Sequence, residues 1–144
     1  EQVAPTGPVY QAGTLSGNPV AMAAGLAQLN IITDHPEIYT VMETSASYIA
    51  NHLRASAEKH GIAMQVNQIG SLLCPYFTET PVNCYAAAKK SDTKRYAAYF
   101  NGMLKRGIYL APSQFEAMFV SSVHTQNDLA CTVQAAEETL SEMA

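Results

Sequence analysis

Charged residues are scarce in this sequence of 144 residues. Asp, Glu, Lys and Arg together make up 14% of it, whereas about 25% is usual for a soluble protein. Hydrophobic residues make up 48%, and a chain this apolar is not disordered. Its length fits one domain with a buried core. The shortage of charge indicates that part of the surface is covered by another domain or subunit.

Positive charge is the scarcer sign. The chain has 8 Lys and Arg against 12 Asp and Glu, a net charge of −4. Because nucleic-acid phosphates are bound by clustered cations, this balance argues against a nucleic-acid partner. The most apolar stretch, residues 20–32, is too short to span a bilayer and polar residues interrupt it. We also find no signal peptide, and we therefore expect no membrane partner.

Cysteine is present in an odd number, three, without a Cys-x-x-Cys spacing. This excludes a disulfide framework and favours a reducing, cytoplasmic location. The four histidines have no metal-ligand spacing with each other or with the cysteines, so no metal site is expected. No serine lies in a nucleophile-elbow context. We interpret the cysteines as structural rather than nucleophilic.

Hydrophobic spacing predicts helices at both ends of the chain. Asn18 and Pro19 form a helix start, and residues 20–33 are apolar nearly all round, which predicts packing against a second domain or subunit. Residues 34–60 carry one apolar stripe that ends before Gly61. A third helix follows Asp92. The last begins at Thr125 with a capping-box pattern.

Four short strands are predicted between the helices, at residues 62–66, 72–78, 108–110 and 119–123. Pro75 places the second of them at an edge or a bulge. These elements predict an α+β fold, with a small, mainly antiparallel sheet covered by helices and preceded by a long linking helix. We expect the chain to divide into residues 1–33 and residues 34–144.

Two segments could carry chemistry. Residues 13–19 combine two glycines, two hydroxyls and a helix start, which fits either a phosphate site or a plain capped turn. Glu116 lies among apolar residues, so its carboxylate is exposed, paired or shifted in pKa. It is either a cation partner or proton-transfer group in a pocket, or a carboxylate at a loop bend. We interpret His124 as structural rather than catalytic.

The same two segments resemble a known family. Residues 10–19, Tyr-Gln-Ala-Gly-Thr-Leu-Ser-Gly-Asn-Pro, and residues 107–116, Gly-Ile-Tyr-Leu-Ala-Pro-Ser-Gln-Phe-Glu, resemble the glutamate-1-semialdehyde 2,1-aminomutase family of class III aminotransferases. The resemblance covers essentially the whole chain. It implies a fold-type I pyridoxal-phosphate enzyme that acts as a homodimer, with residues 1–33 ending the large cofactor domain and residues 34–144 forming the small C-terminal domain.

The resemblance also implies roles for particular residues. Gly13 and Thr14 would bind the cofactor phosphate of the partner subunit, and Glu116 would lie at the substrate end of the site, near the amino groups that are exchanged. The substrate would be a small amino-aldehyde, glutamate-1-semialdehyde, converted to 5-aminolevulinate for tetrapyrrole synthesis. The cofactor would supply the electron sink. The location would be the cytoplasm, or a plastid in a plant or alga.

Three features depart from the family pattern, and one is the run Leu72-Leu73-Cys74-Pro75 in place of a run usually rich in Gly and Phe. Met118 stands where the family usually has glycine, and we expect it to crowd the bend. The Schiff-base lysine is expected in a segment before Glu1, because none of the five lysines has the required context. The isolated chain is therefore expected to be inactive. The alternatives are the same domain of another class III aminotransferase, acting on ω-amino acids, and a non-catalytic dimerisation domain.

Overall fold

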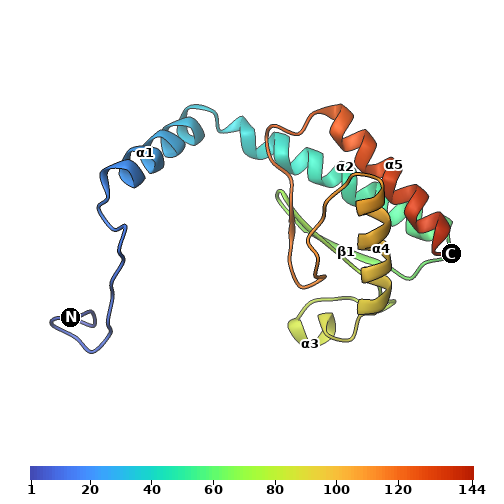
Figure 1. Cartoon of the computed structure of the whole chain (residues 1–144), viewed down its shortest axis with the longest axis horizontal. Coiled ribbons are helices and arrows are strands. Elements are labelled where there is room, and N and C mark those ends of the chain that lie inside the picture. Colours follow the sequence, from blue (N-terminus) through green and yellow to red (C-terminus); the bar gives the residue numbers. More distant parts are fainter. The chain divides into compact units, whose positions relative to one another are not determined.

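The computed structural model describes all 144 residues as two compact units, Glu1–Pro36 and Glu37–Ala144. Their assignment to the end of a large cofactor domain and to a small C-terminal domain stays a prediction. Helix α1 (Pro19–Asp34) dominates the first unit and is drawn in blue in Figure 1. No helix of either unit combines the length and apolar character needed to cross a bilayer.

Helix α1 begins where the sequence predicts it. The Asn18 Oδ1 atom accepts hydrogen bonds from the N–H groups of Val20 and Ala21, at 3.0 and 3.1 Å. This cap satisfies two of the donors that a helix start leaves open. No residue of α1 is buried. Its large apolar side chains are more than half exposed: Val20, Met22, Leu26, Leu29 and Ile31. The packing surface predicted from the sequence is therefore uncovered in this chain.

The second unit is a three-stranded antiparallel sheet with four helices, which confirms the predicted α+β fold. The strands lie in the order β1-β2-β3, and β2 pairs along its whole length with β1 but only at Leu72 and Leu73 with β3. The elements are α2 (Glu37–Lys59), β1 (Gln65–Ile69), β2 (Leu72–Tyr76), α3 (Tyr85–Ala88), α4 (Thr93–Lys105), β3 (Met118–Phe119) and α5 (Gln126–Glu142).

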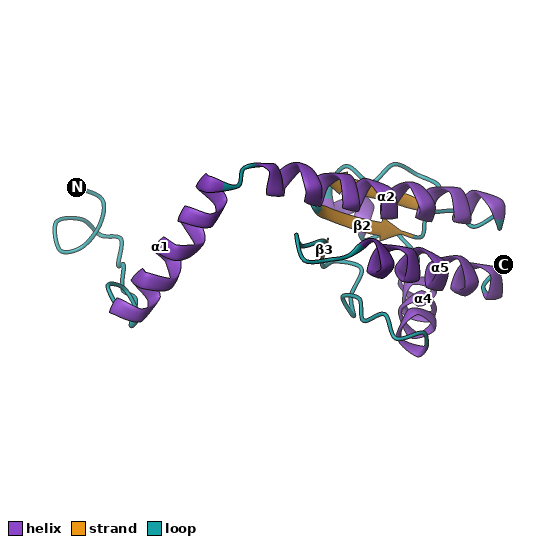
Figure 2. Cartoon of the chain, turned by 90° about the horizontal axis from the view of Figure 1, so that it is seen from above, coloured by secondary structure: helices purple, strands orange, loops and turns teal.

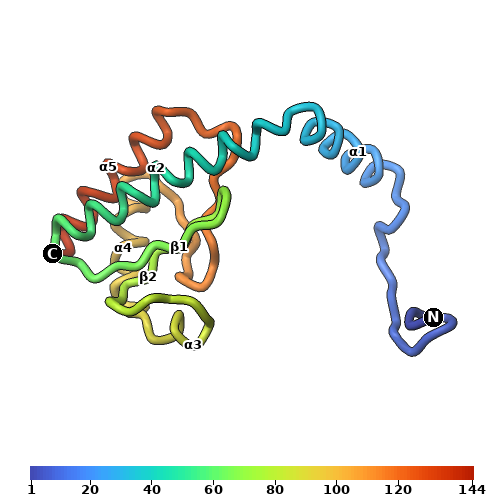
Figure 3. The backbone as a smooth tube through the Cα atoms, turned by 180° about the vertical axis from the view of Figure 1, so that it is seen from behind, coloured from blue at the N-terminus to red at the C-terminus, as the bar shows by residue number.

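The helices of this unit pack in a defined order. Helix α2 lies against β1 and β2 and against α5, and α5 also contacts α4. Figures 1 and 3 show α2 and α5 side by side, with α3 at the end of the unit away from α2, and Figure 2 shows α2 running along the sheet. Between them lies one hydrophobic core, whose largest fully buried members include Leu53, Tyr99, Met103 and Leu140.

The two later helix starts also agree with the sequence. Asp92 Oδ1 accepts from the N–H groups of Lys94 and Arg95, at 2.9 and 3.0 Å. Thr125 and Asp128 form a reciprocal capping box at the start of α5. Each start is set by residues two or three positions apart in sequence. Short-range sequence patterns can therefore predict them.

The strand predictions were partly wrong. Residues 62–64 are not in β1, because Ile62 closes the end of α2: its N–H donates to the Ala57 carbonyl at 2.8 Å, beyond Gly61 at φ +65°. Residues 108–110 form no strand, β3 is Met118–Phe119 so that residues 120–123 of the predicted strand 119–123 are not in it, and α3 was not predicted. The Ile62 contact is local, whereas the extent of β3 depends on its pairing with Leu72 and Leu73 of β2.

Pro75 lies in the central strand rather than at an edge of the whole sheet. It pairs with Val66 of β1 in an unbroken register, so the strand has no bulge there. On its other side β3 pairs only with Leu72 and Leu73, and no third strand lies beside Pro75. The missing N–H of the proline is tolerated because that side of β2 is locally an edge.

Candidate functional site

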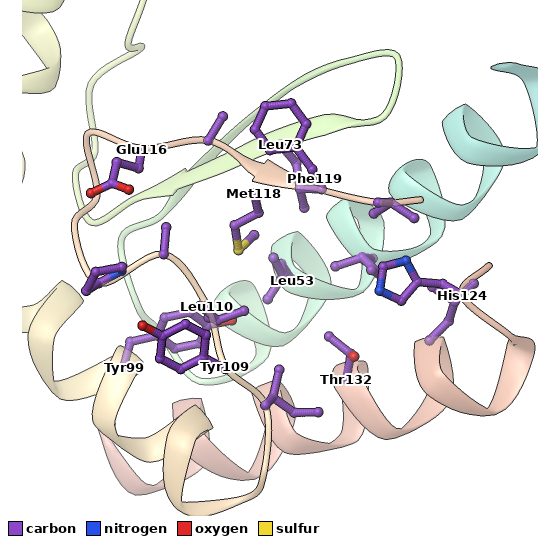
Figure 4. Close-up of a pocket in the computed structure, with 17 residues that line it drawn as sticks. Leu53, Leu73, Tyr99, Tyr109, Leu110, Glu116, Met118, Phe119, His124 and Thr132 are labelled. Carbon is purple, nitrogen blue, oxygen red and sulfur yellow. The ribbon is translucent and has the colours of Figure 1, made fainter. Parts of the chain in front are cut away.

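A cavity of about 590 Å³ opens between α2, α5 and the chain on either side of β3. Its walls are mostly apolar and include Leu53, Leu73 and Leu110. Figure 4 shows Glu116 at one end of this cavity and His124 at the other. An apolar hollow with a few polar groups at its edge is the usual form of a small-molecule site.

Glu116 lies in a loop, residues 111–117, that has no helix or strand. Within the loop, the Glu116 N–H donates to the Ser113 carbonyl at 3.1 Å, and the Phe115 N–H donates to Ser113 Oγ at 3.2 Å. Glu116 is exposed. Of the three states that the sequence left open for this carboxylate, the structure has the exposed one. Its negative charge can therefore meet a ligand without first breaking an ion pair.

Met118 does not crowd the bend as expected. It lies in β3, opposite Leu73, and its side chain packs against the hydrophobic core. Figure 4 shows this side chain directed into the cavity, between Leu53 and the loop. The departure from the family pattern thus changes the cavity wall, and the hollow beside Glu116 persists.

His124 has a structural contact, as predicted. Its Nδ1 atom accepts a hydrogen bond from the Ser121 N–H at 2.9 Å. This contact closes the turn that leads into α5, whose first residue is Gln126. A neutral imidazole that accepts at Nδ1 carries its proton on Nε2. The ring lines the cavity, and its hydrogen bonds go to Ser121 rather than to a carboxylate of the kind that orients a catalytic histidine.

Gly13 and Thr14 lie in the first unit, in the turn that precedes α1. The Ser16 N–H donates to the Gly13 carbonyl at 3.1 Å. A Cβ atom added at Gly13 would lie 2.4 Å from Ser16 Oγ, so the Ser16 side chain would have to rotate away to admit it. Thr14 is exposed. Glu116 belongs to the other unit.

The start of α1 offers no donors of its own to an anion. The Asn18 side chain takes the N–H groups of Val20 and Ala21, the Asn18 carbonyl takes that of Met22, and Pro19 has none. This is the capped turn that the sequence allowed. Upstream, the N–H groups of residues 13–15 donate to no acceptor within the chain. Together with the Thr14 hydroxyl they are the donors that fit a phosphate.

Two side chains of the site were not predicted from the sequence. Tyr96 of α4 donates from its hydroxyl to the Ala111 carbonyl at 2.6 Å, and Cys74 of β2 donates from its thiol to the Gln114 carbonyl at 3.2 Å. Both hold the backbone of the loop that carries Glu116. The only feature of the sequence that could have identified Tyr96 and Cys74 is that each carries a polar atom on a side chain expected to be buried. No three His, Cys, Asp or Glu side chains gather as they would around a metal ion.

Comparison with known proteins places these residues in context. No family model matches the chain. It is 58% identical over 142 residues to the glutamate-1-semialdehyde 2,1-aminomutase of Ruminiclostridium cellulolyticum, an alignment that covers 99% of the chain and 33% of that protein. The chain therefore spans about one third of the length of this relative.

Solved structures give the same picture of the fold. The chain matches a β-phenylalanine aminotransferase from Variovorax paradoxus with a TM-score of 0.81 and 26% identity, over 96% of the chain and 32% of that protein. It also matches a transaminase solved with pyridoxal phosphate bound, with a TM-score of 0.75 and 21% identity, over 96% and 31%. In sequence the chain matches the C-terminal third of glutamate-1-semialdehyde 2,1-aminomutases along nearly its whole length, and in fold it matches the corresponding part of aminotransferases.

Proposed function

We propose that this chain supplies one wall and one phosphate-binding corner to the active site of a glutamate-1-semialdehyde 2,1-aminomutase. The full-length protein would isomerise the amino-aldehyde to 5-aminolevulinate. The observation that carries the proposal is the 58% identity to an aminomutase across 99% of the chain. Pyridoxal phosphate, when bound, would supply the electron sink for the reaction. The chain's own residues would bind, orient and neutralise charge.

Gly13 and Thr14 are the proposed phosphate ligands. The capped start of α1 leaves the N–H groups of residues 13–15 and the Thr14 hydroxyl as donors, and donors of this kind suit a dianionic phosphate. The absence of a Cβ at Gly13 leaves room beside the Ser16 hydroxyl. In a homodimer this turn would bind the cofactor of the partner subunit. The uncovered apolar side chains of α1 support such an assembly.

Glu116 is the proposed substrate-end carboxylate. It is exposed at the end of an apolar cavity of about 590 Å³, where an anion would attract the ammonium groups of an amino-aldehyde or a diamine. An attraction that strengthens as the water leaves the site would hold the migrating amino group in place. The Schiff-base lysine would come from elsewhere in the full-length protein, so the isolated chain would be inactive.

The test is an assay of the full-length protein that contains this chain. It should form 5-aminolevulinate from glutamate-1-semialdehyde with no added amino acceptor. Glu116→Gln keeps the shape of the side chain and removes its charge, so turnover should fall at least tenfold while the thermal midpoint stays the same. Glu79→Gln, a substitution of the same kind at an exposed residue outside the cavity, serves as the control.

Each alternative predicts a different result. A class III aminotransferase for ω-amino acids would need a keto acid as amino acceptor, and its turnover on glutamate-1-semialdehyde alone would be negligible. A non-catalytic dimerisation domain would tolerate Glu116→Gln with wild-type turnover. The first result would contradict the proposed reaction, and the second would contradict the role proposed for Glu116.

A further inference from the structure

We propose that Tyr96 and Cys74 are positioning residues that hold the loop of residues 111–116 and thereby fix the place of the Glu116 carboxylate. The inference rests on the proposed function of Glu116. It begins from the loop itself, which has no helix or strand to support it. Its two internal hydrogen bonds both end on Ser113, so they shape the bend without fixing it to the rest of the unit.

Tyr96 holds the first end of the loop. It is 3% exposed, and its hydroxyl donates to the carbonyl of Ala111 across 15 positions of sequence, at 2.6 Å. Burial, followed by the nearby Cys74 and Glu116, raises the pKa of Tyr96 to about 12, so the hydroxyl keeps its proton and remains a donor. The influence of Glu116 on this group indicates that the carboxylate and the tether lie in the same neighbourhood.

Cys74 holds the second end. Its buried thiol donates to the Gln114 carbonyl at 3.2 Å and lies 3.8 Å from the Glu116 carbonyl, across 40 and 42 positions of sequence. Burial raises the pKa of the Cys74 thiol, with a hydrogen bond from Tyr76 acting in the opposite direction. A protonated thiol is the form that can donate. The contact joins the backbone next to Glu116 to a strand paired throughout its length.

Gln114 shows that the loop is held at a cost. Its side chain is 1% exposed, its Nε2 atom is 3.5 Å from the Ala88 carbonyl, and its Oε1 atom is buried without a partner. A buried acceptor without a partner opposes this placement of the loop. The hydrogen bonds of Tyr96 and Cys74 offset the free-energy cost of this buried acceptor. Removing either bond should therefore shift the loop toward other conformations.

The first measurement follows the loop without using activity. Amide hydrogen exchange of a peptide that covers residues 111–119 should be faster in Tyr96→Phe than in the unaltered chain, by about 2- to 12-fold for one lost hydrogen bond. Tyr48→Phe removes the same atom from a tyrosine on α2, outside the loop and the cavity, and should leave this peptide unchanged. Equal exchange in the two variants would overturn the proposal.

The second measurement is a double-mutant cycle in the full-length enzyme. Tyr96→Phe should lower kcat by about 2- to 12-fold, and the same substitution should have less than a twofold effect once Glu116 is Gln. Cys74→Ala should behave in the same way, whereas Cys74→Ser retains a donor and should restore most of the loss. Effects of equal size in both backgrounds would overturn the positioning role while the function of Glu116 stands. Wild-type turnover in Glu116→Gln alone would instead overturn the proposed function, and this inference with it.

Discussion

Replacing Glu137 by Gln should weaken the contact between α2 and α5. Glu137 of α5 contacts two side chains at the end of α2 and one just beyond it: the Lys59 ammonium at 2.5 Å, the Ser56 hydroxyl, and the His60 ring at 2.9 Å. The Lys59 side chain is 67% exposed and that of Glu137 is 35% exposed, so solvent screens their attraction. An exposed ion pair contributes about 0.2–1 kcal/mol, and one part-buried hydrogen bond about 1 kcal/mol.

The expected loss at pH 7 is therefore about 1–2 kcal/mol, or about 4–16 °C in the thermal midpoint of a unit this small. The three contacts, led by that of Lys59, hold the pKa of Glu137 at about 2, well below its ordinary value of 4.5. Because the pKa is lower in the folded state, the stabilisation is complete above pH 4.5 and is lost as the pH falls toward 2. The variant lacks the titrating group, so the two proteins should converge in stability over that window.

Thermal unfolding by circular dichroism at pH 7, 4 and 3 measures both effects. Glu58→Gln is a matched control, since it removes the same charge from an exposed residue one position before Lys59. The control should unfold within about 0.5 kcal/mol of the unaltered protein. A difference between Glu137→Gln and the unaltered protein that is the same at pH 7 and pH 3 would refute the assigned contacts.

Two further substitutions test other parts of the chain. Thr14→Ala in the full-length protein should weaken retention of pyridoxal phosphate roughly ten- to a hundredfold, because one charge-assisted donor is lost; equilibrium dialysis measures this, and affinity within twofold of normal contradicts the phosphate assignment. Gly102→Ala should destabilise the unit by about 1–3 kcal/mol in urea, because the new Cβ would lie 2.4 Å from Thr139 Cγ2. Gly25→Ala, with open space around it, is the control, and a stabilised Gly102→Ala would contradict the close approach of α4 to α5.

Local sequence rules predicted the helices well because each start is decided within three or four residues. Asn18, Asp92 and Thr125 all cap the helices that were expected to follow them. Ile62 shows the limit of the same rules: its alternation with polar neighbours favours a strand, yet its N–H closes α2. The ends of a strand depend on which neighbouring strand it can pair with. Strand β3 pairs with only two residues of β2.

Sequence rules likewise identified one residue of the candidate site and missed others. Glu116 was predicted because its neighbours in sequence are apolar and because the segment before it resembles a known family. Tyr96 and Cys74 act on the same loop from 15 and 40 positions away, and no periodic pattern connects residues so far apart. The exposed state of Glu116 and the placement of Met118 in the cavity wall likewise follow from packing that one sequence does not display.

The three thiols of the chain differ in how a reagent can reach them. Cys84 and Cys131 are exposed, whereas Cys74 is buried, and burial also raises its pKa and so lowers its thiolate fraction. Cys84 and Cys131 would react quickly with an alkylating reagent. Cys74 would react only as fast as β2 separates from the loop. The alkylation rate of Cys74 would therefore report how often the loop opens. The rates of the two exposed thiols would serve as the internal standard.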